Sequence, residues 1–162
     1  MKLNEGVEWA LHCCALLAAL PSGKALPAYK LAHFFELPAP YLAKHLQQLS
    51  AADLVETLKG PKGGYRLAKP ANKVSLLDIV EAIDGRSPCF QCTEIRQNGP
   101  TAASPKSYKS KCVIARAMHA AEEAWRTKLA QVSLQEIQFM GLAEMPSDQV
   151  EKTAVWMRDM LS

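Results

Sequence analysis

The fold is decided by residues 38–67, PAPYLAKHLQQLSAADLVETLKGPKGGYRL. Pro40 suits the first turn of a helix, and Leu42, Leu46 and Leu49 then recur at the i, i+4, i+7 spacing of one apolar helix face. The other face carries side chains that can form hydrogen bonds, namely Tyr41, Lys44, Gln47 and Gln48. The spacing predicts an amphipathic helix with a polar outer surface.

This helix is followed by the pattern of a β-hairpin. Residues 54–67 read as a strand (LVETL), a turn (GPKGG) that needs the freedom of glycine at positive φ, and a return strand (YRL). The turn region carries Lys59 and Lys62, and at Gly63 no side chain keeps the backbone away from a ligand. The hairpin tip can therefore approach phosphate groups closely.

A shorter helix precedes the amphipathic one. Pro27 lies at its first turn, and its apolar residues end with Phe35, because the residue before Pro38 is disfavoured in the helical region. Two short helices with a tight turn and a β-hairpin behind them form a winged helix-turn-helix. The candidate DNA-binding residues are the outer face of the second helix and the wing: Tyr41, Lys44, Gln48, Lys59, Lys62 and Gly63.

Outside this region the chain reads as further helices and one long loop. Asn4 can cap a helix over residues 5–20, and the apolar pattern of residues 75–83 predicts another helix that stops at Gly85. Residues 86–111, rich in Ser, Pro, Gly and Lys, read as a loop, which at this length is usually functional or mobile. Helices are predicted beyond it over residues 111–132, 133–140 (ending at Gly141) and 147–161.

We therefore expect a mainly α protein with a small β-hairpin wing and a long dimerisation helix. The predicted parts are a winged helix-turn-helix DNA-binding domain (1–85), a sensor loop (86–111), the dimerisation helix (112–134) and C-terminal helices (135–162). The dimerisation helix carries a narrow apolar stripe, which suits packing against a partner helix but could also face the core of its own domain. The predicted dimer-interface residues are Ile114, Met118, Trp125 and Leu129.

Composition narrows the function classes. The 162 residues are 49% hydrophobic and 22% charged, which is typical of a globular protein, and a net charge of +3 is too small for a surface that is basic throughout. No apolar run is long enough to span a membrane, and Glu5, Glu8 and His12 do not fit a secretory signal. We expect a cytoplasmic protein whose five cysteines are not structural disulfides.

Several segments resemble the Rrf-two family of bacterial winged-helix transcriptional regulators. The resemblance extends nearly to Val132, and its most specific part is the wing motif. It implies a homodimer that binds a palindromic double-stranded operator, and many members sense iron-sulfur clusters, nitric oxide or redox state through loop cysteines. The segments that carry it are YLAK (41–44), GPKGGYRL (60–67) and LDIVEAIDG (77–85).

The usual three-cysteine pattern of that family is incomplete, since Cys92 and Cys112 match its outer pair while Lys106 or a neighbour stands at the middle position. VEWALHCC (7–14) and CTEIRQNGP (92–100) instead resemble a redox-sensing RsrR-like subgroup. That subgroup implies a 2Fe-2S cluster held by two loop cysteines of one subunit and by a Glu and a His of the other. Residue by residue, these are Cys92, Cys112, Glu8 and His12.

The residues themselves agree with this ligand set. Glu8 and His12 stand at i, i+4 and so project from one face of a helix, as metal-binding pairs do, although such a pair can also be an ordinary surface pair. Replacing thiolate by imidazole raises the potential of such a cluster. Trp9, next to a ligand, is a candidate switch residue, with a plain core role as the alternative.

Other interpretations remain open. A clusterless regulator could use Cys89, Cys92 or Cys112 as a thiol switch, and Cys89, Cys92, Cys112 and His119 could hold zinc. An enzyme is disfavoured because the sequence has no nucleotide-binding glycine fingerprint after a strand and no nucleophile elbow, and we expect no small-molecule substrate. A pure protein-interaction module would lack salt-dependent DNA binding.

Overall fold

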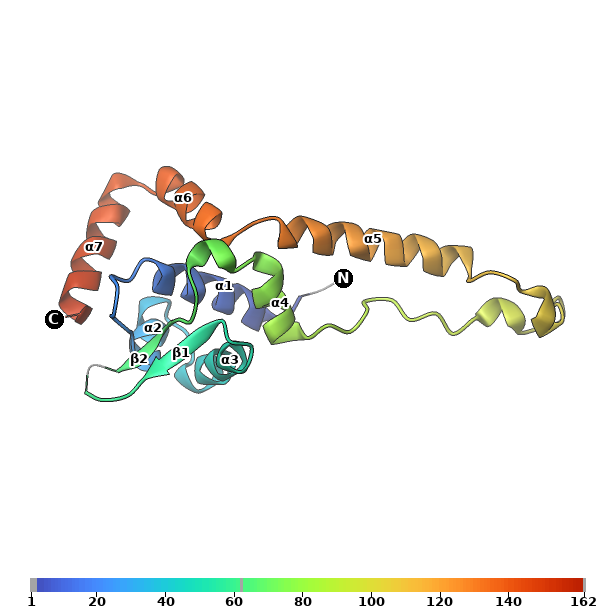
Figure 1. Cartoon of the computed structure of the whole chain (residues 1–162), viewed down its shortest axis with the longest axis horizontal. Helices are drawn as coiled ribbons and strands as arrows, with labels where there is room; N and C mark the ends of the chain where they lie inside the picture. Colours follow the sequence, from blue (N-terminus) through green and yellow to red (C-terminus); the bar gives the residue numbers. More distant parts are fainter. Residues whose placement is uncertain (1–2, 62, 162) are drawn as a thin grey trace.

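The computed structural model describes residues 3–61 and 63–161 and confirms the expected class, mostly helical with one antiparallel hairpin. The chain forms a rounded head from which a long arm projects (Figure 1). We call residues 85–130 the arm and the rest the head. The elements are α1 (Glu5–Ala18), α2 (Ala28–Phe34), α3 (Ala39–Ala51), β1 (Val55–Leu58), β2 (Gly64–Leu67), α4 (Leu76–Asp84), α5 (Val113–Ala130), α6 (Leu134–Glu144) and α7 (Ser147–Leu161).

The core of the head lies where the apolar faces of α1, α3 and α4 meet. Leu42, Leu46 and Leu49, the stripe that predicted α3, are fully buried there, and burial of each stabilises the fold by about 1.5–3 kcal/mol. The middle of α1 is apolar on nearly every side and contributes Cys13 and Cys14 to the same core. This core fixes the position of α3 relative to α1.

Side-chain caps and one proline set the ends of several helices. The Asn4 side chain accepts a hydrogen bond from the Gly6 N–H at 2.8 Å, as the sequence predicts for the start of α1. The prediction that a helix ends at Gly141 is wrong, because α6 continues to Glu144. Pro146 explains the true end, since it forces the preceding residue out of the helical region.

The wing is short and tied to the head. Val55 pairs with Leu67 and Leu58 with Gly64. Gly63 lies in a tight turn where a side chain would collide with the Leu58 carbonyl, so glycine is required there by the hairpin itself. Lys62, predicted at the tip, lies outside the described residues.

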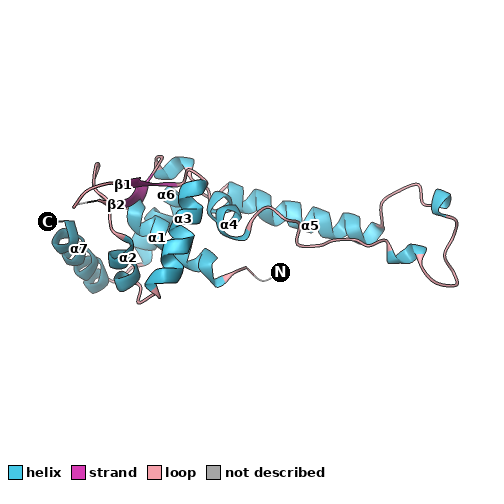
Figure 2. Ribbon diagram, turned by 90° about the horizontal axis from the view of Figure 1, so that it is seen from below, coloured by secondary structure: helices cyan, strands magenta, loops and turns pink. Residues whose placement is uncertain are grey.

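The arm is built from the long loop and α5. The loop leaves α4, runs out along α5, turns at its far end and returns (Figures 1 and 2). At its base Arg126 of α5 bonds Glu81 of α4 at 2.8 Å and Glu122 at 2.9 Å, and it also donates to the Ser87 carbonyl. This neck network (Glu81, Glu122 and Arg126) fixes the arm to the head.

The last helix folds back over α2. Trp156 of α7 makes an edge-to-face contact with Phe34, with ring centroids 4.6 Å apart, and Lys30 donates to the Met160 carbonyl at 2.6 Å. Within the described residues no helix is long and apolar enough to cross a membrane.

Candidate DNA-binding face and cysteine pair

The polar face of α3 is exposed at its first two predicted contact residues. Tyr41 is 66% exposed, and Lys44 points to solvent one turn later. On the wing Lys59 is also exposed, whereas Arg66 is held across the strands by Glu56 at 2.7 Å. Tyr41, Lys44 and Lys59 therefore present hydrogen-bond donors to a ligand on the head.

Gln48 behaves differently from these residues. Its side chain is half-buried, with the oxygen 2.9 Å from the His45 ring and the NH₂ group 3.4 Å from the Ile83 carbonyl of α4. The same His45 ring contacts Trp9 of α1 edge-on, with centroids 5.9 Å apart. Gln48, predicted to face the groove, is thus linked through His45 to the switch candidate Trp9.

Gly6 makes this link possible. A Cβ at Gly6 would collide with the His45 ring, so only glycine lets the ring lie against α1. Sequence reasoning missed both Gly6 and His45 as functional candidates. The i, i+3 spacing of His45 and Gln48 was the only available signal, and it is common on helices.

The structure brings Cys92 and Cys112 together on the arm. Both are half-buried, and Cys112 is the residue that precedes the first turn of α5. The backbone N–H groups of Ala115 and Ile114 and the Cys92 thiol hydrogen-bond to Cys112 and lower the pKa of its thiol. The two sulfurs therefore lie side by side, and the Cys112 thiol ionises more readily than an ordinary thiol.

Glu8 and His12 form a second pair, on the head. Both side chains are exposed on consecutive turns of α1, and the His12 ring lies 5.7 Å from that of Phe35. Within one described chain no three His, Cys, Asp or Glu side chains lie close enough to hold a metal ion. The four predicted ligands thus lie as two separate pairs, one at the start of α5 and one on α1.

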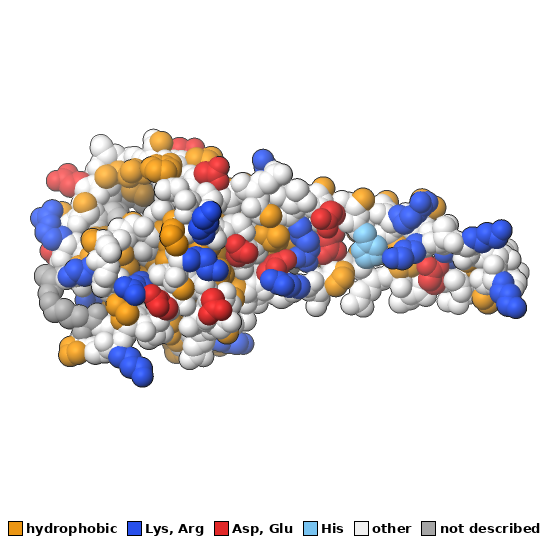
Figure 3. Space-filling view, viewed as in Figure 1, with side chains coloured by type: hydrophobic (Ala, Val, Ile, Leu, Met, Phe, Trp, Pro, Cys, Tyr) orange, Lys and Arg blue, Asp and Glu red, His pale blue; other side chains and the backbone are white. Residues whose placement is uncertain are grey.

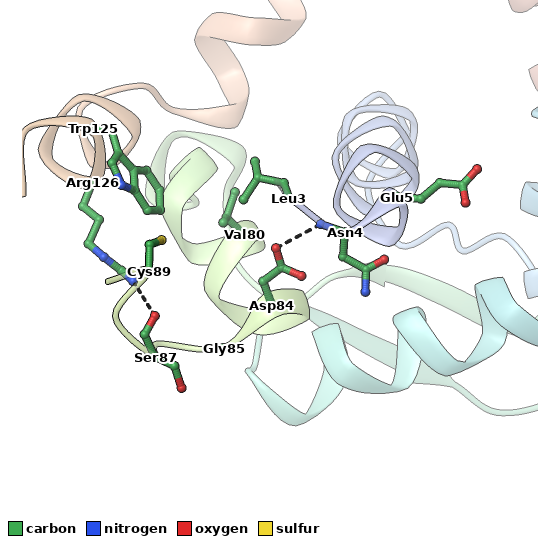
Figure 4. A pocket seen from close by; sticks show the side chains of 10 residues that line it. All are labelled: Leu3, Asn4, Glu5, Val80, Asp84, Gly85, Ser87, Cys89, Trp125 and Arg126. Atoms are coloured by element: carbon green, nitrogen blue, oxygen red, sulfur yellow. Dashed lines mark hydrogen bonds between the residues drawn. The ribbon is translucent and has the colours of Figure 1, made fainter. Parts of the chain in front are cut away.

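Cys89 sits apart, at the neck. Its backbone N–H donates to Glu122 at 3.0 Å, and its side chain lines a shallow pocket with Trp125 and Arg126 of α5 and the end of α4 (Figure 4). Cys89 is exposed to solvent.

The predicted dimer stripe divides into two halves. Trp125 and Leu129, near the neck, pack partly buried against the core of the head. Ile114 and Met118, nearer the far end, are 65% and 44% exposed. Intramolecular packing, the alternative weighed for the stripe, thus accounts for its proximal half, and only the distal half offers an open apolar surface.

Two curated relatives of this chain bear the names of transcriptional regulators. The chain is 31% identical over 137 residues to YwgB of Bacillus subtilis (strain 168), which bears the name of an HTH-type transcriptional regulator, and the match covers 85% of this chain and 84% of YwgB. A second relative, YffB of Lactococcus lactis, is 30% identical over 137 residues, covering 85% of this chain and 86% of YffB.

Solved structures share the fold. IscR of T. potens superposes with a TM-score of 0.67 at 18% identity, covering 91% of this chain and 93% of that one. CymR of B. subtilis, titled the global cysteine regulator, gives 0.63 at 19% identity, covering 86% and 98%. The family described as "Rrf2: Iron-dependent Transcriptional regulator" matches residues 3–138, so the chain belongs to the Rrf2 family of DNA-binding transcriptional regulators.

Proposed function

We propose that this protein is a cytoplasmic, homodimeric repressor whose affinity for a palindromic operator is set by the redox state of a 2Fe-2S cluster. The observation that carries the proposal is the separation of two ligand pairs along one chain. Cys92 and Cys112 lie on the arm, while Glu8 and His12 lie on the head. A second copy, with its arm against the first head, would bring the pairs together.

The donor chemistry fits such a cluster. Two thiolates suit one iron, and imidazole nitrogen with carboxylate oxygen suit the other. Exposed basic side chains at the far end of the arm, Lys106, Lys109, Lys111 and Arg116, would offset part of the negative charge (Figure 3). When bound, the cluster would supply reversible one-electron chemistry, and the residues of this chain would hold it and sense its charge.

On the DNA side, α3 would enter the major groove with Tyr41 and Lys44. Lys59, and Lys62 and Gly63 at the wing tip, would engage the backbone or the adjacent minor groove. Twofold symmetry of the dimer would require a palindromic site.

A contact route joins the proposed cluster to this face. Trp9 follows Glu8 in α1 and touches His45, which in turn bonds Gln48 on α3. A change of charge at Glu8 and His12 would therefore bias the position of the recognition helix. A coupling of about 1–3 kcal/mol, which is several-fold in operator affinity, is typical of such two-state links.

The second candidate is a clusterless thiol switch based on Cys89, Cys92 or Cys112. The hydrogen bond between Cys92 and Cys112 and the lowered pKa of Cys112 favour it. An oxidised form of Staphylococcus aureus CymR also shares the fold, with a TM-score of 0.62 at 22% identity. In this case a two-electron oxidant such as a peroxide would take two electrons from the Cys92 and Cys112 thiols of the metal-free protein, and their sulfurs would form a disulfide with release of both protons.

The test is the visible spectrum and the iron and sulfide content of protein purified without oxygen. We expect a coloured protein with one cluster per shared site, and loss of both colour and redox-dependent operator binding in Cys92→Ala and in Cys112→Ala. Cys89→Ala is the matched control and should retain both. A fully coloured Glu8→Ala, His12→Ala double variant would refute the ligand set, and colourless wild-type protein would favour the thiol switch.

A further inference from the structure

Cys92 and Cys112 lie on the outgoing and returning segments of the arm, and one arginine joins those two segments. The Arg96 guanidinium donates to the Glu94 carboxylate and to the Ser110 carbonyl, both at 2.6 Å. Glu94 is two residues from Cys92, and Ser110 is two residues from Cys112. One side chain thus ties together the backbone segments that carry the two sulfurs.

Tyr108 provides a second tie between the same segments. Its ring lies under the guanidinium of Arg96, 4.9 Å from carbon to centroid, and its hydroxyl donates to the Arg96 carbonyl at 2.8 Å. The hydroxyl also accepts from the Ala103 N–H at 3.1 Å, which fixes the turn between the segments. We call Glu94, Arg96, Tyr108 and Ser110 the loop clasp.

The backbone beside Cys92 supports the same interpretation. Glu94 has φ 54°, a left-handed conformation that is unfavourable for a residue with a side chain. In that conformation its N–H points at the Cys92 sulfur, 3.4 Å away, while its carboxylate holds Arg96. These two contacts offset the cost of the left-handed conformation of Glu94. Both also restrain the position of the Cys92 sulfur.

We propose that Arg96 and Tyr108 are positioning residues that hold the Cys92 and Cys112 sulfurs at chelating separation before any metal arrives. The ligand class rests on the proposed function, since a half-site of two thiolates takes a thiophilic metal centre such as one iron of a 2Fe-2S cluster. Because the loop is ordered in advance, cluster binding does not have to supply the free energy of ordering it. The planar fork of Arg96 is essential, because the single ammonium of lysine cannot make the same forked contacts.

Metal-free protein tests the clasp directly. In a Cys89→Ser background, dibromobimane, which fluoresces only after both of its ends have alkylated thiols, should cross-link Cys92 to Cys112 within one chain. We expect Arg96→Ala to slow the cross-link by roughly tenfold relative to single-ended alkylation, because the charge-assisted hydrogen bond to Ser110, which joins the two segments, is lost. Tyr108→Phe should slow it less, and Arg96→Lys should restore only a minor part.

Arg116→Ala is the matched control, because Arg116 lies on the same arm and is exposed, with no side-chain partner among the described residues. Circular dichroism should show equal helix content in all variants. If Arg96→Ala cross-links as fast as Arg116→Ala, or if the wild-type cross-link forms mainly between chains, the clasp is refuted.

A second measurement separates the clasp from the proposed function. In cluster-loaded protein, Arg96→Ala and Arg96→Lys should speed the release of iron to a chelator, whereas Arg116→Ala, which removes a charge of the arm but no contact of the clasp, should leave the release rate unchanged. Rapid cross-linking in a wild-type protein that never acquires a cluster would support the clasp and refute the proposed cluster. Slow cross-linking in a wild-type protein that does acquire a cluster would support the cluster and refute the clasp.

Discussion

At the scale of single residues, burial divides the five cysteines into two chemical classes. Cys13 and Cys14 are fully buried in α1, and burial raises the pKa of the Cys13 thiol from 9.0 to about 12 and that of Cys14 further. Cys89 is exposed, and Cys92 and Cys112 are half-buried on the arm. Only the cysteines outside the core, Cys89, Cys92 and Cys112, can react with reagents in solution or bind a metal without unfolding of the head.

This division predicts a labelling pattern and a pH dependence. Iodoacetamide should modify Cys89, Cys92 and Cys112 of the native metal-free protein and leave Cys13 and Cys14 untouched until denaturant is added, as peptide mass mapping would show.

The unfolded Cys13 thiol ionises above pH 9 while the folded one stays neutral to about 12, so its contribution to stability is complete below pH 9 and declines above it.

Because of Cys13, the free energy of unfolding measured by urea titrations should fall by about 1.4 kcal/mol per pH unit between pH 9 and 11. Cys13→Ala should flatten this slope, whereas the control Cys89→Ala should not. Rapid labelling of Cys13 in native protein would contradict its placement in the core.

At the scale of elements, the sequence was most informative where a helix end carries its own chemical signal. Asn4 and the Ser75 and Ser133 capping boxes mark helix starts that local hydrogen bonds determine. Gly141 misled because glycine weakens a helix by only about 1 kcal/mol, so α6 continues through it until Pro146 ends the helix.

Pairings between distant elements were beyond sequence reasoning. The apolar spacing of Trp125 and Leu129 is the same whether they face a partner chain or their own head, and only tertiary structure distinguishes the two. Gln48 was predicted on the outer face of α3, but its side chain is half-buried, because its contacts with His45 and Ile83 depend on how closely α1 and α4 approach. The loop clasp depends likewise on contacts between segments 14 residues apart.

The neck network predicts a loss of stability when its arginine, Arg126, is replaced. Arg126, Glu81 and Glu122 have side chains only 16%, 17% and 10% exposed, so Arg126→Met would leave two shielded carboxylates with less positive charge nearby. We expect the free energy of unfolding to fall by about 1–3 kcal/mol in urea titrations. Arg116→Met, on the exposed face of the same helix, should change it by less than about 0.5 kcal/mol. Equal losses in the two variants would show that the neck does not hold the arm.

At the scale of the whole molecule, the arm extends beyond what the head can cover. The far half of α5 exposes Val113, Ile114 and Met118, and this helix belongs to the chain's longest projection (Figure 1). Exposed apolar side chains gathered along a projecting helix are typical of a surface that a partner covers. A second arm would cover it symmetrically, and the same association would carry the cysteine pair of one chain toward the Glu8 and His12 pair of the other.

Met118→Asp tests this assembly. A carboxylate at Met118 would lose its hydration in a helix–helix seam and find no partner there, at a cost of several kcal/mol. Sedimentation equilibrium should therefore give a dimer for the wild type and a monomer for the variant, and operator binding and visible colour should be lost with the dimer. Ala120→Asp adds the same charge on the opposite side of α5 and should stay dimeric and coloured. A dimeric Met118→Asp would place the seam elsewhere, and a monomeric variant that keeps its colour would show that the cluster needs ligands from one chain only.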